Sequence, residues 1–234
     1  MYHSIKFGDK NTWDDWHLIP STRPVINPPE PKYNFIDIPG RDGSLDGSEI
    51  LTGYPVFKNR TGSLEFIVAN DYWNSWVEAY STILKYLHGK RMKAILEDDP
   101  NYYYEGRFSV NNWKSDKNYS LIVIDYNVEP YKKSVLSSAD PWLWDPFNFN
   151  TGVIRSFVDI YVDGSLTLHP VGSEQRVIPV FISSDPMTVT YLGVEYQLEA
   201  GRTQIPEIQI CPCENDLVFT GTGTISIEYR EGEL

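Results

Sequence analysis

Only one segment of the chain has the periodicity of a helix, and this restricts the fold more than any other feature of the sequence. In residues 72–88 the apolar side chains recur at helical spacing and form one stripe, made of Trp76, Tyr80, Ile83, Leu84 and Leu87. Asp71 stands where a helix N-cap is expected, and Gly89 stands where a left-handed C-cap would end the helix. Elsewhere apolar and polar residues alternate over short runs, so we predict a mainly β protein with one helix.

Short strands are expected on both sides of this helix. They fall at residues 2–7, 33–38, 63–69, 92–96, 102–113 and 119–128. Turn residues separate the last three strands, which predicts a β-meander. Residues 119–128 are almost continuously apolar, so this strand is expected in the centre of its sheet. The helix is expected to cover one face of the same sheet.

Residues 19–31 cannot form a central strand. Five prolines fall within twelve residues, and each removes a backbone hydrogen-bond donor: Pro20, Pro24, Pro28, Pro29 and Pro31. The segment is therefore predicted to be an extended arm with polyproline character. Because such an arm does not fold on itself, we expect it to lie against its own domain or against a neighbouring subunit.

The character of the chain changes between residues 130 and 146, and we place a domain boundary at about residue 135. Beyond it we expect eight short strands, at residues 153–162, 165–169, 177–183, 187–191, 194–198, 203–210, 217–220 and 224–230. Asp163-Gly164 and Leu192-Gly193 have the composition of hairpin turns. Short strands at this spacing are typical of a β-sandwich or jelly roll. The predicted domains are therefore residues 1–135 and 136–234.

Composition and charge limit the possible partners. The net charge is −12, and an acidic surface repels phosphate, which argues against nucleic-acid binding. Aromatic residues make up 14% of the chain, enough for both a β-rich core and subunit interfaces. The sequence starts without an apolar stretch of signal-peptide length, and no segment has the length and apolarity of a membrane span. We therefore expect a protein that is made in the cytoplasm and does not enter a membrane.

The two cysteines of the chain, Cys211 and Cys213, are separated only by Pro212. The four histidines are scattered singly along the sequence, so the paired ligands of a structural zinc site are missing. A disulfide between the two cysteines is not expected in a reducing compartment. We predict free thiols at the end of a strand.

Three acidic residues, Glu97, Asp98 and Asp99, come directly before Pro100 between two expected strands. A solvated turn accounts for them more simply than paired catalytic acids or a calcium site. The sequence contains no motif of serine hydrolases, phosphate-binding loops, dinucleotide-binding folds or zinc proteases. We predict a structural protein with no enzymatic activity, no cofactor and no metal.

Four segments, taken in their order and spacing, resemble the distal tail protein of siphophages and related prophages. They are WDDWHLIPSTRPVINPPEPKYNFIDIPGRDGSLDGSE at residues 13–49, YLHGKRMKAILEDDPNYYYEGR at 86–107, YSLIVIDYNVEPYK at 119–132 and TGTGTISIEYREGEL at 220–234. The resemblance covers most of the chain and is firmer in the N-terminal half.

The resemblance implies a particular architecture and role. The N-terminal domain would be a β-sandwich or split barrel with a helix, related to tail-tube subunits, and would close into a ring of six. The C-terminal domain would be a galectin-like β-sandwich outside the ring. The hub ring would join the tail tube and tape-measure protein to the tail-tip or baseplate proteins of the virion, after synthesis in the host bacterial cytoplasm. One ring and two stacked rings both remain open.

An extended belt segment in this family reaches the neighbouring subunit. The arm at residues 19–31 is our candidate for that contact. The side chains that we expect at the subunit interface are Trp13, Trp16, Pro24, Pro28 and Pro29.

Two alternative functions use the same sequence features. The abundant aromatic residues and the predicted C-terminal sandwich would also suit a carbohydrate-binding module that contacts the host cell wall. However, His169 is followed by Pro170 and Val171, and no tryptophan follows Trp144, so the sugar-binding motif of galectins is missing and carbohydrate binding is in doubt. A tail-tip enzyme that degrades cell wall is the other alternative, and it lacks a visible acid pair or metal site.

Overall fold

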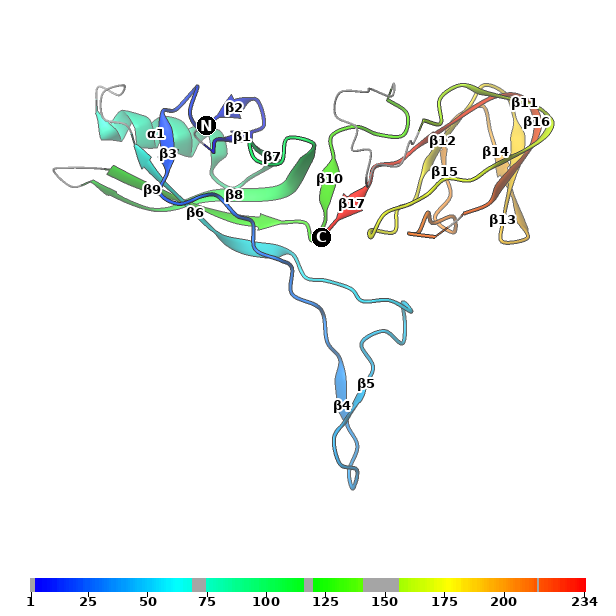
Figure 1. Cartoon of the computed structure of the whole chain (residues 1–234), viewed down its shortest axis with the longest axis horizontal. Helices are drawn as coiled ribbons and strands as arrows, with labels where there is room; N and C mark the ends of the chain where they lie inside the picture. Colours follow the sequence, from blue (N-terminus) through cyan, green and yellow to red (C-terminus); the bar gives the residue numbers. More distant parts are fainter. Residues whose placement is uncertain (1–2, 69–74, 116–119, 141–155, 214) are drawn as a thin grey trace. The chain divides into compact units, whose positions relative to one another are not determined.

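The apolar run at residues 119–128 forms the strand β9 (Ser120–Val128) in the computed structural model, which describes residues 3–68, 75–115, 120–140, 156–213 and 215–234. The chain divides into two compact units, Met1–Lys132 with Leu234 (unit 1) and Lys133–Glu233 (unit 2). Figure 1 shows that both are built mainly of strands. Within the described residues there is one α-helix, so the predicted fold class is confirmed.

Unit 1 contains an antiparallel sheet in which β9 has a neighbour on each side. The strand order is β2-β1-β7-β8-β9-β6-β3, with bounds β1 Ile5–Phe7, β2 Lys10–Asn11, β3 Leu18–Pro20, β6 Arg60–Val68, β7 Lys90–Leu96 and β8 Tyr102–Ser115. The predicted meander is therefore present as β7–β8–β9. Alternate residues of β9 are buried, as expected for a strand with one face on the core.

The helix α1 (Trp76–Leu87) begins later than the sequence predicts. Ser75 is its N-cap, and the Ser75 hydroxyl accepts a hydrogen bond from the backbone of Glu78. The cap expected at Asp71 lies outside the described residues. Gly89 has a φ of +73°, so the predicted left-handed residue after the helix is confirmed. Trp76 is exposed, because only the part of the stripe beyond the first turn reaches the core.

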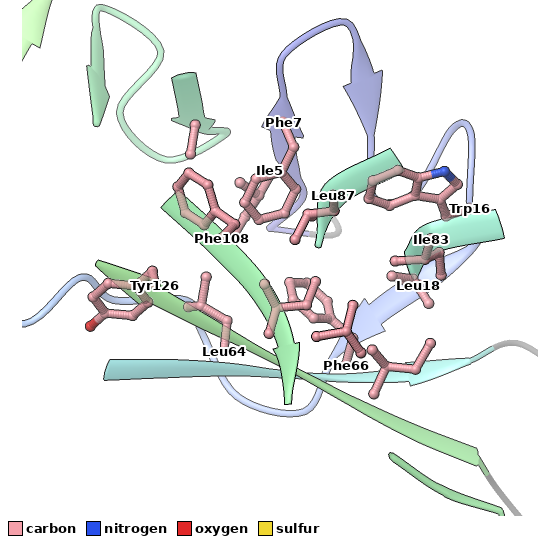
Figure 2. Close-up of a cluster of buried hydrophobic side chains, with 14 of the residues drawn as sticks. Ile5, Phe7, Trp16, Leu18, Leu64, Phe66, Ile83, Leu87, Phe108 and Tyr126 are labelled. Atoms are coloured by element: carbon pink, nitrogen blue, oxygen red, sulfur yellow. The ribbon is translucent and has the colours of Figure 1, made fainter. Parts of the chain in front are cut away.

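Side chains from the sheet and from α1 meet in one core (Figure 2). Phe7 of β1 and Phe108 of β8 pack edge to face, with ring centroids 4.9 Å apart. Ile83 and Leu87 of α1 are fully buried in the same cluster. The helix thus stabilises the sheet by covering the apolar side of β1, β6, β8 and β9.

Two short strands of unit 1, β4 (Phe35–Asp37) and β5 (Ser44–Asp46), pair with each other and with no other strand in the described parts of the chain. The strand expected at residues 33–38 is therefore present, but it is not part of the large sheet. Its partner lies in the glycine-containing stretch after it, between Gly43 and Gly47, where the sequence indicated only turns and bends.

Unit 2 is built on a second antiparallel sheet. Its strand order is β14-β13-β16-β12-β15, with β11 also paired to β16, and the bounds are β11 Ile160–Leu168, β12 Val180–Ser183, β13 Met187–Tyr191, β14 Val194–Leu198, β15 Gly201–Gln204 and β16 Leu217–Glu228. Two further short strands, β10 (Lys132–Ser134) and β17 (Gly232–Glu233), pair with each other. The core of this unit is formed mainly by side chains from β11, β12, β13, β14 and β16, including Phe181 of β12 and Phe219 of β16.

One of the two hairpin turns predicted in unit 2 is wrong. Asp163 and Gly164 lie in the middle of β11, where Gly164 pairs with Gly221 of β16. Gly221 and Gly223 have φ values of +149° and +148°, and a Cβ at Gly221 would lie 2.7 Å from the Cβ of Met187. The glycines therefore let two long strands bend together instead of ending them, which merges strands that the sequence separates.

The other predicted turn is confirmed. Leu192 and Gly193 join β13 to β14, and the register pairs Tyr191 with Val194 directly across the two-residue loop. Both loop residues have positive φ, 50° and 79° respectively. This is the geometry of a type I′ turn, which matches the twist of the strands that it connects.

The prediction of free thiols is also wrong, since Cys211 and Cys213 are joined in a disulfide. The buried Asn215 side chain folds this loop: its oxygen accepts from the backbone of Cys211 at 3.2 Å, and its amide donates to the carbonyls of Pro170 at 2.9 Å and Cys213 at 2.7 Å. These bonds curl the three-residue stretch so that the two sulfur atoms meet. The sequence argument considered the redox compartment and did not include this local geometry.

Candidate assembly surface

The structure places the two predicted interface tryptophans in different environments. Trp16 is buried in the core of unit 1, where its ring lies 5.4 Å from that of Tyr86 and 6.4 Å from that of Phe7. Figure 2 shows the Trp16 ring beside this cluster. Trp13 is only half-buried, with its ring 5.4 Å from that of His17. Trp16 thus packs within its own chain, and only Trp13 presents a surface to a neighbour.

The proline-containing segment lies against its own unit over most of its length. Pro24 and Pro29 are buried and Pro28 is exposed. The backbone of Ser21 donates to Glu65 of β6 at 3.0 Å, and Asn27 donates to the hydroxyl of Tyr126 at 2.9 Å. The sequence leaves open whether residues 19–31 lie against their own domain or against a neighbouring subunit. These contacts are with the chain's own domain.

The segment that follows is the one that leaves the sheet. At its base Pro31 pairs with Phe57, Lys32 donates to the carbonyl of Val56, and Lys58 donates to that of Glu30, both at 2.8 Å. Beyond this base β4 and β5 form a hairpin, which Figure 1 shows as a blue extension of unit 1. We call residues 31–57 the hairpin arm.

Large apolar side chains on the hairpin arm are exposed. They are Tyr33, Phe35, Ile36, Ile38, Leu45, Ile50 and Leu51. Leu51 is 97% exposed and Phe35 is 58% exposed. The rings of Tyr33 and Phe35 stack 5.6 Å apart on one face, whereas Ile36 pairs with Leu45 on the opposite face. Both faces of the hairpin are therefore apolar.

An isolated two-stranded hairpin is marginally stable in water, and a contiguous apolar surface on an otherwise polar chain is a usual sign of a protein interface. Carboxylates border the apolar side chains. Ser44 donates to Asp37 at 2.5 Å, and hydrogen bonds from Ser48 lower the pKa of Asp46. The hairpin arm thus combines an apolar centre with a polar rim, which is the usual anatomy of an interface.

The hairpin arm begins where the predicted arm of residues 19–31 ends, and sequence reasoning did not locate it. The prolines mark where the sheet ends, but exposure of Tyr33, Phe35 and Leu51 can be judged only when the rest of the chain is in place. The available signal was the alternating run at residues 33–38 followed by a second run between Gly43 and Gly47, which together have the pattern of a hairpin.

The acidic run before Pro100 holds neighbouring segments together. Asp98 accepts from His3 and from Arg23, each at 2.9 Å, and Asp99 pairs with Lys132 at 2.9 Å. The hydrogen bond from Arg23, followed by that from His3, lowers the pKa of Asp98. The turn is therefore less solvated than predicted, because its carboxylates fix the start of the chain and the start of the proline segment.

Neither metal-binding geometry nor a membrane helix was found in the described parts of the chain. No group of three or more His, Cys, Asp or Glu side chains is arranged to hold a metal ion there. The same residues include no helix that is long and apolar enough to cross a membrane.

No protein-family model matches the chain, and no curated protein matches it. Among solved structures, the fold is similar over its whole length to that of a phage protein of the hub adsorption apparatus. This is the Dit protein (gp 19.1) of phage SPP1, described as a paradigm of that apparatus in phages that infect Gram-positive bacteria. The TM-score is 0.65 with 13% sequence identity, and the match covers 100% of each chain. The chain therefore has the Dit fold, as the resemblance of its segments to distal tail proteins implied.

Proposed function

We propose that the chain is a structural subunit of a phage tail tip or baseplate, that six copies close into a hub ring, and that it catalyses no reaction. The observation that carries this proposal is the full-length likeness to SPP1 Dit, a hub protein, in both units and not in one domain alone. The number six comes from the family resemblance.

The hairpin arm supports assembly with further copies of the chain. A ring needs a heterologous contact, in which one surface of a subunit meets a different surface of the next. The exposed side chains of Phe35, Ile36 and Leu51 give the arm an apolar surface that is separate from the rest of its own unit. In our proposal the hairpin arm takes the role that the sequence suggested for residues 19–31, and the half-buried Trp13 and the exposed Pro28 remain candidate contacts.

The ring would lie at the virion tail tip, after synthesis in the host bacterial cytoplasm. It would join the tail tube and the tape-measure protein to the host-adhesion device. The net charge of −12 favours protein partners over nucleic acid.

Measurement of the native mass of the full chain, followed by negative-stain electron microscopy, tests the proposal. A six-fold ring is expected at high protein concentration. A strictly monomeric protein that forms no ring at any concentration would contradict the proposal.

The carbohydrate alternative has one observation in its favour. On the outer face of the unit 2 sheet, the register places Tyr161, which is 63% exposed, beside Thr224, and the exposed Asp163 beside Thr222. An aromatic ring next to hydroxyl and carboxylate groups is a surface that a sugar can bind. Binding of the full chain to a glycan array that is lost in Tyr161→Ala would support this second role, and absence of binding would remove it.

A further inference from the structure

Arg60, the first residue of β6, is a buried cation at the base of the hairpin arm. Its side chain is only 4% exposed. Its Nε donates to the carbonyl of Pro130 at 2.7 Å, and its Nη1 donates to the carbonyl of Asn27 at 3.2 Å. One planar group therefore connects the segment that enters the arm, the segment that returns from it and the chain just beyond β9.

No carboxylate forms an ion pair with Arg60 in the described part of the chain. Its charge instead faces the ring of Tyr104, with Cζ 5.5 Å from the ring centroid. Burial lowers the pKa of the guanidinium, but arginine stays protonated in proteins, so the charge is retained. Its third nitrogen, Nη2, is buried without a hydrogen-bond partner in the structure.

Such an arrangement is costly for stability alone, because a buried charge without a counter-ion and a buried donor without an acceptor both disfavour folding. A leucine or methionine at this position would fill the same space without that cost. The presence of arginine here therefore points to a need for its rigid, forked geometry, which can hold two carbonyl groups in fixed directions at once.

A second set of contacts fixes the same point of the chain. The amide of Asn27 donates to the hydroxyl of Tyr126 at 2.9 Å, and its side chain donates to the carbonyl of Thr61 at 3.1 Å. Figure 2 shows the Tyr126 hydroxyl pointing away from the core cluster. Gly62 makes room for these groups, since a Cβ there would lie 2.4 Å from the Tyr126 hydroxyl.

We infer that Arg60 sets the direction in which the hairpin arm leaves unit 1. One guanidinium ties the outgoing strand at Asn27 to the returning strand, and through Pro130 it ties both to the sheet. Beyond this point the two strands of the base are connected by backbone bonds between residues 30–32 and 56–58 and by the ion pair of Lys58 with Glu30 at 3.0 Å. Loss of the guanidinium would leave the arm attached through these contacts and through those of Asn27, but with a wider range of directions. The consequence for assembly rests on the proposed function: an arm held in one direction loses less freedom when it docks on a second copy.

Single-molecule energy transfer on the full chain tests this inference. Dyes are placed at two exposed positions of unit 1, Asp42 on the arm and Lys6 on β1, with Cys211 and Cys213 replaced by serine. Sub-nanomolar concentration keeps every copy monomeric, so docking cannot orient the arm. We expect one narrow population for the parent chain and a distribution roughly twofold broader for Arg60→Met, because the arm base opens locally.

The matched control is Arg202→Met, which removes an exposed arginine from unit 2 and should leave the distribution unchanged. A distribution for Arg60→Met as narrow as that of the parent chain would overturn the inference. If Arg60→Met does not fold, Arg60→Lys decides the question, since lysine keeps the charge over Tyr104 but lacks the fork. The energy-transfer distribution of Arg60→Lys should also be broader than that of the parent chain. A distribution as narrow as the parental one would show that the forked guanidinium is not needed.

The proposed function can fail separately. A parent chain that never forms rings would reject the hub assignment, while the energy-transfer widths would still decide the role of Arg60. With ring formation established, Arg60→Met should assemble roughly tenfold more weakly than Arg202→Met, because the free arm must be ordered on docking. Equal assembly of the two variants would overturn the proposed link between arm direction and ring formation.

Discussion

Replacement of Phe35 and Leu51 by serine should weaken assembly roughly a hundredfold and leave the monomer folded. Full burial of a large aliphatic or aromatic side chain contributes about 2 kcal/mol. Leu51 is 97% exposed and Phe35 is 58% exposed, so their burial in a subunit contact can contribute about 2 and about 1 kcal/mol respectively. Loss of about 3 kcal/mol per contact raises the dissociation constant roughly a hundredfold.

Sedimentation velocity over a concentration series measures this shift, and thermal unfolding of the monomer reports on the fold. The free energy of unfolding of the monomer should change by no more than about 1 kcal/mol, since the ring contact that Phe35 loses among the described residues is the stack with Tyr33. Leu192→Ser is the matched control: Leu192 is 84% exposed, but it lies on the β13–β14 turn of unit 2. Assembly of the double variant at the parental concentration, or an equal loss in Leu192→Ser, would refute the reasoning.

Three further predictions concern stability. Ser75→Ala removes the N-cap of α1 and should lower the free energy of unfolding, measured in urea, by about 1 kcal/mol. An unchanged free energy of unfolding would show that the cap does not stabilise the helix. The hydrogen bond from Lys10, then that from the backbone of Asn11, lowers the pKa of Asp15 in the folded chain, so this stabilisation is present at neutral pH and is lost as the pH falls below about 4. The free energy of unfolding, measured at a series of acidic pH values, should therefore depend less on pH in Asp15→Asn than in the parent chain. Identical pH profiles of the two proteins would contradict a lowered pKa of Asp15. Asn215→Ala should lower the melting temperature more than reduction of the disulfide, because that disulfide closes a very short loop while Asn215 bonds several buried groups; the opposite order would refute this account.

The parts of the fold that follow from local patterns could be predicted from the sequence. The stripe through Ile83 and Leu87 specifies a helix because its period is that of a helix, whatever surrounds it. The run in β9 predicts a central strand because its residues are almost continuously apolar. Leu192-Gly193 specifies a turn because the strands on either side of it alternate and pair in register.

The parts that depend on distant neighbours could not be predicted in this way. Asp163-Gly164 has turn composition, but the pairing with Gly221 in β16 keeps it extended. Trp16 resembles an exposed anchor in the sequence, and only the positions of Phe7 and Tyr86 bury it. The role of Arg60 can be recognised only when Asn27 and Pro130 are known to lie beside it. No local sequence pattern contains that information.

The self-paired hairpin has a consequence for how such a subunit can evolve. Because β4 and β5 pair with each other and not with the large sheet in the described structure, residues can be added to both strands between the base and the tip without a change in that sheet. Addition of two residues to each strand keeps every existing side chain on its own face of the hairpin. It lengthens the arm by about 7 Å. The reach of the subunit is therefore a quantity that can vary almost independently of its fold, so that spacing between subunits could be adjusted while the core of each subunit stays the same.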